Sequence, residues 1–167
     1  MNVQEKNLSR EISALMWNSG VTVSTAESCT AGQISAALTS IPGSSTYYKG
    51  GIVCYTNEVK TKLLGVSPEL IDDKGAVSEE VACEMVKGAL QYLDTTYAVA
   101  VTGYAGPTAG DEAPVGTIWV AVGNEFEIQT CRLQGDEGRD KNLQKATIKA
   151  LQMLLTLLKK HHPGDEE

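Results

Sequence analysis

The stretch VTVSTAESCTAGQISAALTSI, residues 21–41, sets the fold expected for this chain. It opens with an alternation of β-branched and small polar residues, which is typical of a strand. From Cys29 onward it is rich in helix-forming residues, and Ile34, Leu38 and Ile41 recur at helical spacing. A strand that leads into a helix is the repeating unit of α/β domains, so the segment predicts a sheet covered by helices.

The rest of the chain extends this pattern. The apolar, β-branched runs predict further strands at 50–56, 97–103 and 117–133, the last being two strands around a turn at 123–124. Amphipathic spacing and cap residues predict helices at 8–20, 57–66, 67–75, 77–93 and 139–160. Because the helices alternate with the early strands and a hairpin comes late, we expect a three-layer α/β/α domain. Its sheet should be mixed and mostly parallel, with an antiparallel edge hairpin.

The chain length and composition restrict the class of protein. With 167 residues, we expect one domain over residues 1–160, followed by a flexible acidic tail at 161–167. The net charge is −7 and the only arginines are Arg10, Arg132 and Arg139, so no basic stripe is available for nucleic acid. The sequence has no apolar run of membrane-spanning length and no signal-peptide pattern. Four scattered cysteines without a CxxC motif favour a reducing compartment, so we expect a cytoplasmic protein.

The histidine content excludes several kinds of site. The only histidines are His161 and His162, which fall in the charged C-terminal segment and are expected to lie in solvent. A Ser-His-Asp triad and a histidine-based zinc site both need a histidine held in a cleft. We therefore expect no metal and no cofactor, and any general base should be a different residue type.

Small polar residues follow or precede several of the predicted strands. Ligands in α/β folds bind beyond the carboxyl ends of parallel strands, so loops that meet there would form one pocket. The residues expected around this pocket are Ser28, Ser45, Tyr55, Lys60, Thr102 and Gly103.

Two of these residues allow opposing interpretations. Ser28 could be an ordinary helix cap, or part of a helix start whose free amides bind an anion or an oxyanion. A nucleophile elbow is excluded because Ala26 and Thr30 occupy its glycine positions. Lys60 could be solvated, or it could be a neutral base whose pKa is lowered by burial and by the helix dipole. Ser–Lys dyads use such a lysine without histidine.

Four segments in fixed order resemble one known family. They are TAESCTAGQIS, IPGSSTYYKGGIVCYTNEVKTKLLGV, GAVSEEVACEMVKGAL and AVAVTGYAGPTAG, the last followed by PVGTIWVAV. From about residue 5 to residue 160 the chain is similar to the CinA C-terminal domain, whose active members are nicotinamide-nucleotide amidases. The resemblance implies metal-independent hydrolysis of the carboxamide of nicotinamide mononucleotide to nicotinic acid mononucleotide and ammonia. It implies a small-molecule nucleotide as the partner, and because related domains often pair, a homodimer stays open.

The resemblance also implies roles for individual residues. Ser45 matches the nucleophile and Lys60 the general base, while Ser28, Tyr55 and Thr102 match supporting polar positions. We assign substrate binding to Thr30, Gly103 and Arg139. The residues alone leave open whether Ser45 or Ser28 attacks the substrate, because both hydroxyls could reach Lys60.

The chain departs from the family pattern at two places. Ala31 stands where the family has glycine. Before the last helix, Glu137 and Gly138 are inserted; Arg139 matches the first of two family arginines, but Leu143 stands in place of the second. This second change bears on the binding of a substrate phosphate. The alternative reading is therefore a non-catalytic nucleotide-binding or protein-interaction module on the same fold.

Overall fold

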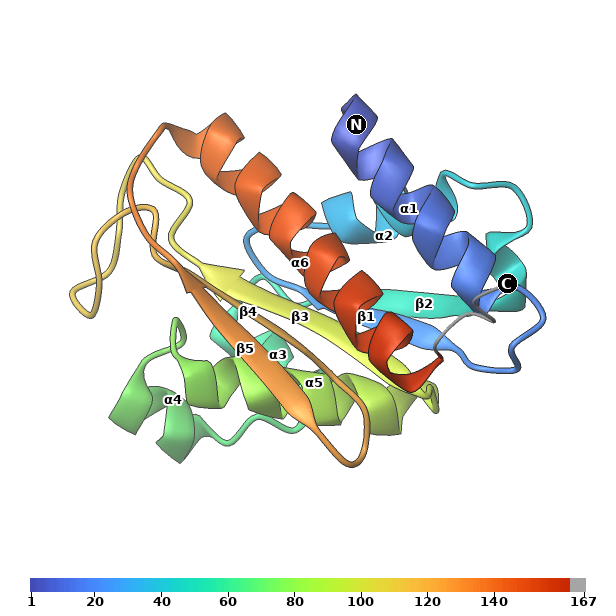
Figure 1. The fold of residues 1–167 in the computed structure, drawn as a ribbon. Helices are drawn as coiled ribbons and strands as arrows, with labels where there is room; N and C mark the ends of the chain where they lie inside the picture. Colours follow the sequence, from blue (N-terminus) through green and yellow to red (C-terminus); the bar gives the residue numbers. More distant parts are fainter. Residues whose placement is uncertain (163–167) are drawn as a thin grey trace.

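The computed structural model describes residues 1–162 (Figure 1). The elements in this part of the chain are α1 (Val3–Met16), β1 (Val23–Glu27), α2 (Gln33–Thr39), the 3₁₀ helix η1 (Ser44–Thr46), β2 (Tyr48–Val53), α3 (Asn57–Leu64), α4 (Pro68–Lys74), α5 (Glu79–Leu93), β3 (Tyr97–Gly103), β4 (Ile118–Gly123), β5 (Ile128–Leu133) and α6 (Arg139–His161). No helix within residues 1–162 combines the length and the apolar character of a membrane span.

The strands form one sheet in the order β2-β1-β3-β4-β5. β1 runs parallel to β2 and β3, whereas β4 runs antiparallel to β3 and β5. Glu27 at the end of β1 lies opposite Val53 of β2 and Val101 of β3, so the carboxyl ends of these strands share one edge of the sheet. We call this the carboxyl edge, and the opposite one, where the same strands begin, the amino edge. The predicted α/β fold with a mixed sheet and a late antiparallel hairpin is confirmed.

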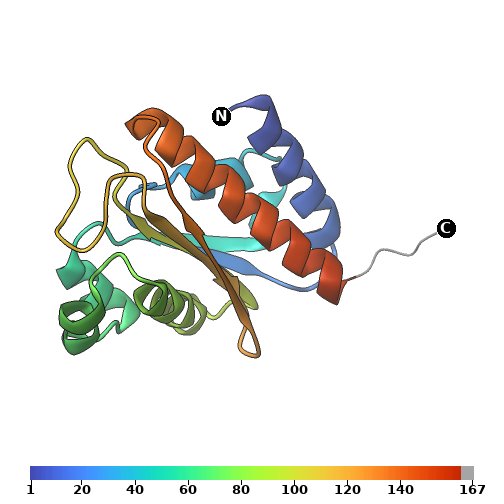
Figure 2. The ribbon, with the colours of Figure 1, turned by 60° about the vertical axis from the view of Figure 1, so that its left-hand side comes forward.

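Helices cover both faces of the sheet. α1, α2 and α6 lie on one face and α3, α4 and α5 on the other, as the two views show (Figures 1 and 2). The first face holds a core built around residues such as Ile12 and Leu151, and the second around residues such as Met85 and Val86. Because β3 is central, its residues from Tyr97 to Thr102 are buried from both sides, which matches its continuous apolar sequence.

Hydroxyl side chains begin three of the helices. Thr56, Ser67 and Ser78 are the N-caps of α3, α4 and α5, and each accepts a hydrogen bond from the N–H three residues later. This confirms that cap residues mark the starts of these helices. The α3 cap matters most for function, because it fixes the helix that carries Lys60.

The start of α2 differs from the prediction. The sequence predicts helical structure from Cys29, but residues 28–32 form a tight turn and the helix begins at Gln33. The turn ends in two left-handed residues, Ala31 with φ +47° and Gly32 with φ +101°. Left-handed geometry interrupts a right-handed helix, so the polar residues before Ala31 stay in a loop at the carboxyl edge.

The two histidines do not lie in a solvated tail, so this prediction is wrong. His161 is the last residue of α6, and its Nδ1 lies 2.8 Å from the hydroxyl of Tyr97. Nε2 of His162 lies 3.3 Å from the same hydroxyl, and Nε2 of His161 lies 2.6 Å from Glu127. The apolar stripe of α6 carries these residues onto the amino edge of the sheet. The predicted flexible acidic tail spans residues 161–167, of which 163–167 lie outside the described residues.

Candidate active site

Lys60 is a buried lysine at the carboxyl edge. It lies in α3, one turn after the Thr56 cap, and its side chain is only 2% exposed. Its Nζ lies 3.1 Å from Ser28 Oγ and 3.1 Å from the carbonyl oxygen of Cys54. Because strand ends from β1 and β2 meet at this edge, residues 32 positions apart in the chain form a Ser–Lys pair.

The surroundings of Lys60 favour its neutral form. Burial lowers the pKa of Lys60 below its ordinary value, because the charged ammonium group is poorly solvated inside the protein. Among residues 1–162 no carboxylate forms an ion pair with Lys60. A neutral amine can donate one hydrogen to the Cys54 carbonyl and accept the hydroxyl proton of Ser28, which is the arrangement that a general base needs.

Ser28 is held by the strand that precedes it and is not the cap of α2. Its N–H donates to the carbonyl oxygen of Val101 at 3.0 Å, so the backbone stays attached to β3 after β1 has ended. The side chain is 7% exposed. The interpretation of Ser28 as an ordinary cap of α2 is excluded, because Gly32 is the N-cap, and the Ser28 hydroxyl lies against Lys60.

The two cysteines beside this pair are protonated thiols. Burial raises the pKa of Cys29 to about 12 and that of Cys54 to about 11. The positive charges of Arg139 and Lys60 oppose this rise at Cys29, but burial is the larger effect. Cys29 also packs in the apolar core, so it does not compete with Ser28 as a nucleophile.

The amides of α2 are not free to bind an anion. The carboxylate of Glu27 accepts hydrogen bonds from the N–H groups of Gly32, Ile34 and Ser35 at 3.0, 3.1 and 2.8 Å. The predicted helix-start anion site is therefore filled by an internal carboxylate. No oxyanion or phosphate can use these three donors while Glu27 holds them.

Arg139 and Tyr55 come together near the pair, although they are 84 positions apart in the chain. Arg139 begins α6 and donates to the carbonyl oxygen of Gly106 at 2.6 Å and to the hydroxyl of Tyr55 at 3.2 Å. Tyr55 directly follows Cys54 and is 55% exposed. Asn142, one turn further along α6, donates to the carbonyl oxygen of Ala105 at 3.0 Å. The start of α6 is thus fixed to the loop after β3, and the Arg139 guanidinium stays accessible.

Three other predicted site residues are buried or packed within the fold and make no hydrogen bond to Ser28 or Lys60 within residues 1–162. Thr102 is buried and donates its hydroxyl proton to the carbonyl oxygen of Ala76 at 2.8 Å. Gly103 faces Ile118, whose Cα would lie 2.8 Å from an added Cβ, so glycine is needed for strand packing. Thr30 is fully buried, and its Oγ1 has no hydrogen-bond partner in residues 1–162.

Ser45 does not join the site, which corrects the pairing of Ser45 with Lys60. It is exposed on η1, and η1 precedes β2, where Tyr47 accepts a hydrogen bond from Val23 at the start of β1. Ser45 therefore lies at the amino edge. Lys60 lies beyond the other end of β2, and a strand of this length spans about 20 Å. Within one chain the two side chains cannot meet.

Three further residues shape the site without having been predicted from the sequence. The Cys54 carbonyl orients Lys60, but a backbone acceptor leaves no signal in a sequence. Asn142 lies inside a helix pattern and gives no signal either. Glu27 does give one: an acidic residue at the end of a buried strand, just before a turn, needs several donors to remain charged.

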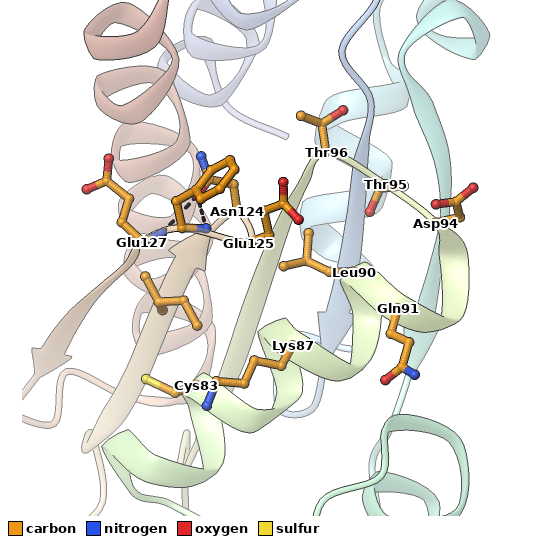
Figure 3. Close-up of a pocket in the computed structure, with 12 residues that line it drawn as sticks. Cys83, Lys87, Leu90, Gln91, Asp94, Thr95, Thr96, Asn124, Glu125 and Glu127 are labelled. Atoms are coloured by element: carbon orange, nitrogen blue, oxygen red, sulfur yellow. Dashed lines mark hydrogen bonds between the residues drawn. The ribbon is translucent and has the colours of Figure 1, made fainter.

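A groove of about 920 Å³ lies far from this site, at the amino edge (Figure 3). Figure 3 shows it between the C-terminal half of α5 and the β4–β5 turn, with Lys87, Leu90 and Asn124 among its lining residues. No cluster of three His, Cys, Asp or Glu side chains suited to a metal ion occurs within the described part of the chain. The buried Ser–Lys pair therefore stays the candidate for chemistry.

Comparison with known proteins gives consistent matches. The family model of the CinA C-terminal domain matches residues 5–158. A relative from Halothermothrix orenii, named for competence-damage induction, is 45% identical over 157 residues, which is 93% of this chain and 38% of that protein. A CinA-like protein from Shewanella pealeana is 50% identical over 118 residues, covering 70% of this chain and 28% of that protein. The chain thus spans well under half the length of these curated relatives.

Solved structures share the fold. The competence/damage inducible protein CihA from Agrobacterium tumefaciens has a TM-score of 0.91 and 40% identity, covering 94% of this chain and 97% of that one. A CinA superfamily protein from Klebsiella pneumoniae 700603 has a TM-score of 0.90 and 30% identity, covering 96% and 99%.

Proposed function

Because the chain belongs to the family of the CinA C-terminal domain, we propose that it hydrolyses the carboxamide of nicotinamide mononucleotide, yielding nicotinic acid mononucleotide and ammonia. The observation that carries this proposal is the 3.1 Å contact between Lys60 Nζ and Ser28 Oγ in a buried site. A buried lysine without a carboxylate partner costs stability, so such an arrangement is best explained by chemistry. The nucleophile is Ser28, and Ser45 has no part in the reaction.

The reaction is an acyl transfer in two steps. Neutral Lys60 takes the hydroxyl proton of Ser28, and Ser28 Oγ attacks the carboxamide carbon. Protonated Lys60 then gives the proton to the leaving amine, so ammonia departs and an ester on Ser28 remains. Water, with its proton taken by Lys60, then attacks the ester carbon; the acyl–Oγ bond breaks, Lys60 returns the proton to Ser28 Oγ, and the carboxylic acid is released.

The negative oxygen that forms in each step needs hydrogen-bond donors. Within residues 1–162, neither the N–H of Cys29 nor that of Thr30 donates to a backbone carbonyl. The N–H that follows the nucleophile is a common oxyanion donor in hydrolases that use a serine on a tight turn. We therefore assign the oxyanion to these two amides, in place of the α2 amides that Glu27 occupies.

Arg139 is the cation assigned to the substrate phosphate. Its guanidinium is accessible and donates to the hydroxyl of the exposed Tyr55, which directly follows Cys54, the residue whose carbonyl oxygen accepts from Lys60. Leu143, at the position of the second family arginine, is 8% exposed and packs in the core, so it offers no charge. Lys145 pairs with Glu137. A single bidentate guanidinium would bind the phosphate less tightly than two arginines.

The proposal is tested by ammonia release from nicotinamide mononucleotide. Ser28→Ala and Lys60→Ala should each lower kcat/KM by at least about 1,000-fold, because each removes half of the pair. Ser45→Ala and Lys62→Ala are the matched controls, since Ser45 lies at the amino edge and Lys62 is exposed on the same helix as Lys60. Both controls should stay within about twofold of wild type.

Two outcomes would contradict the proposal. If wild type released ammonia no faster than Ser28→Ala, the chain would be the non-catalytic nucleotide-binding or interaction module. If Ser45→Ala lost as much activity as Lys60→Ala while staying folded, a neighbouring copy would supply the nucleophile, and the role of Ser28 would be wrong.

A further inference from the structure

Glu27 is a fully buried carboxylate with all of its partners on the turn and helix that follow it. Oε2 accepts from the N–H groups of Gly32 and Ile34, and Oε1 accepts from the N–H of Ser35 and from the Ser35 hydroxyl at 2.6 Å. Among residues 1–162 no cation pairs with Glu27. Four hydrogen bonds and the positive end of α2 compensate the buried charge.

The Ser35 hydroxyl is itself held in place. It lies 2.7 Å from the hydroxyl of Thr25, which lies 3.1 Å from the hydroxyl of Tyr48. An added Cβ at Gly51 would lie 2.1 Å from Thr25 Oγ1, so only glycine leaves room for this cluster. The chain of hydroxyls therefore ties the Glu27 carboxylate to β1 and β2 as well as to α2.

The backbone of Glu27 connects it to both members of the reactive pair. Ser28 is the next residue. The carbonyl oxygen of Glu27 accepts a hydrogen bond from the N–H of Cys54 at 2.9 Å, and the carbonyl oxygen of Cys54 accepts one from Lys60. A shift of Glu27 would therefore displace Ser28 directly and Lys60 through Cys54.

We propose that Glu27 is the positioning residue of the site, whose carboxylate closes the 28–32 turn onto α2 and so holds Ser28 Oγ at reacting distance from Lys60. This inference rests on the proposed function, because it assigns Glu27 to the geometry of the same pair. It gives the buried carboxylate a role beyond capping a seven-residue helix.

The experiment measures the reactivity of Ser28 without the natural substrate. Phenylmethylsulfonyl fluoride forms an ester bond between Ser28 Oγ and its sulfur; fluoride leaves, and the hydroxyl proton passes to Lys60. The rate is followed by intact-mass spectrometry and the site by peptide mapping. Wild type should be modified at Ser28, and Lys60→Ala should not.

Glu27→Gln is the decisive variant. In glutamine an NH₂ group replaces one of the two carboxylate oxygens, and this group cannot accept hydrogen bonds. The two hydrogen bonds that this oxygen accepts are therefore lost, and the turn shifts. We expect sulfonylation to slow by about 10- to 100-fold, since small displacements of a reacting atom have effects of this size. The pH midpoint of the reaction should stay at its wild-type value, because Lys60 remains buried. Ser35→Ala keeps all three amide contacts and should slow the reaction by about threefold.

Ser67→Ala separates positioning from stability. Ser67 caps α4, which like α2 has seven residues, and it has no contact with the pair. Its loss should lower the melting temperature and leave the sulfonylation rate unchanged. A folded Glu27→Gln protein that reacts at the wild-type rate would overturn the role of Glu27 alone. A wild-type chain inert at Ser28 would overturn the proposed function, and the positioning role with it.

Discussion

Lys60 should make ammonia release depend on pH in a defined direction. The base must be neutral, and burial lowers its pKa below the ordinary value of 10.5. We therefore expect kcat/KM on nicotinamide mononucleotide to rise with pH through one ionisation below 10.5 and then to level off. Measuring this profile between pH 5 and 10 checks the assignment, and a flat profile between pH 6 and 9 would count against Lys60 as the base.

The stability of the protein supplies a control for the same ionisation. A lysine with a lowered folded pKa loses its proton more easily when folded than when unfolded. Stability should thus rise with pH between the folded pKa and 10.5, and level off below the folded pKa. Lys60→Met keeps the length and removes the charge, so it should remove this pH-dependent part in urea unfolding. A Lys62→Met control should leave it in place, because Lys62 is exposed.

The sequence predicts the roles of some site residues better than those of others. Lys60 was a reasonable prediction, because the two histidines lie far from the polar strand exits and another base was needed. The sequence left Ser28 and Ser45 as two candidate nucleophiles, because residue spacing does not tell which hydroxyl contacts Lys60. The Cys54 carbonyl could not be assigned and the burial of Thr30, assigned to substrate binding, was not foreseen, because backbone orientation and burial follow from packing.

At the scale of elements, Ala31 is a local source of strain at the start of α2. Its φ of +47° is a left-handed geometry that costs a residue with a Cβ about 1 kcal/mol. Ala31 is exposed, so its methyl group contributes little packing. We expect Ala31→Gly to raise the free energy of unfolding by about 0.5–1 kcal/mol, measured by urea denaturation.

Ala36 provides the matched control for this substitution. It is exposed like Ala31 but lies in the middle of α2 with ordinary helical geometry. Ala36→Gly should lower the free energy of unfolding by about 1 kcal/mol, because glycine is a poor helix former. Destabilisation of similar size in both variants would contradict a strained turn at Ala31.

The order of elements predicted most of the site and explains the error at Ser45. Ser28 follows β1 and Tyr55 follows β2, so both belong at the carboxyl edge, as expected for parallel strands. The PGSS segment precedes β2, and a residue before a parallel strand lies at the opposite edge. The topology thus argued against Ser45, whereas the family motif favoured it. The tight turn of residues 28–32 was missed because its residues also suit a helix.

At the scale of the molecule, the chain uses the two edges of one sheet differently. The carboxyl edge holds the reactive pair, and the amino edge holds the contacts of Tyr97 with the two histidines. α6 joins them, since Arg139 begins the helix and His161 ends it, about 34 Å away. Alternation of strands and helices was enough to predict this architecture. The ordered histidines were not predicted, because polar residues at a chain end look solvated until the helix is seen to reach the sheet.

The amino edge should contribute to stability in acid through Glu127. Hydrogen bonds from Lys160 and His161 hold the pKa of Glu127 at about 2, below its ordinary 4.5. A lowered carboxyl pKa stabilises the folded state above pH 4.5, and this contribution is lost as the pH falls toward 2. Glu127→Gln should therefore be less stable than wild type at pH 6, and the difference should shrink as the pH falls from 4.5 through about 2, as followed by thermal melting. The effect should weaken in high salt, because Glu127 is partly exposed. Glu125→Gln, on the same turn and without hydrogen bonds to Lys160 or His161, is the matched control. Equal behaviour of the two variants would mean that the Lys160–Glu127–His161 contacts do not hold the end of α6.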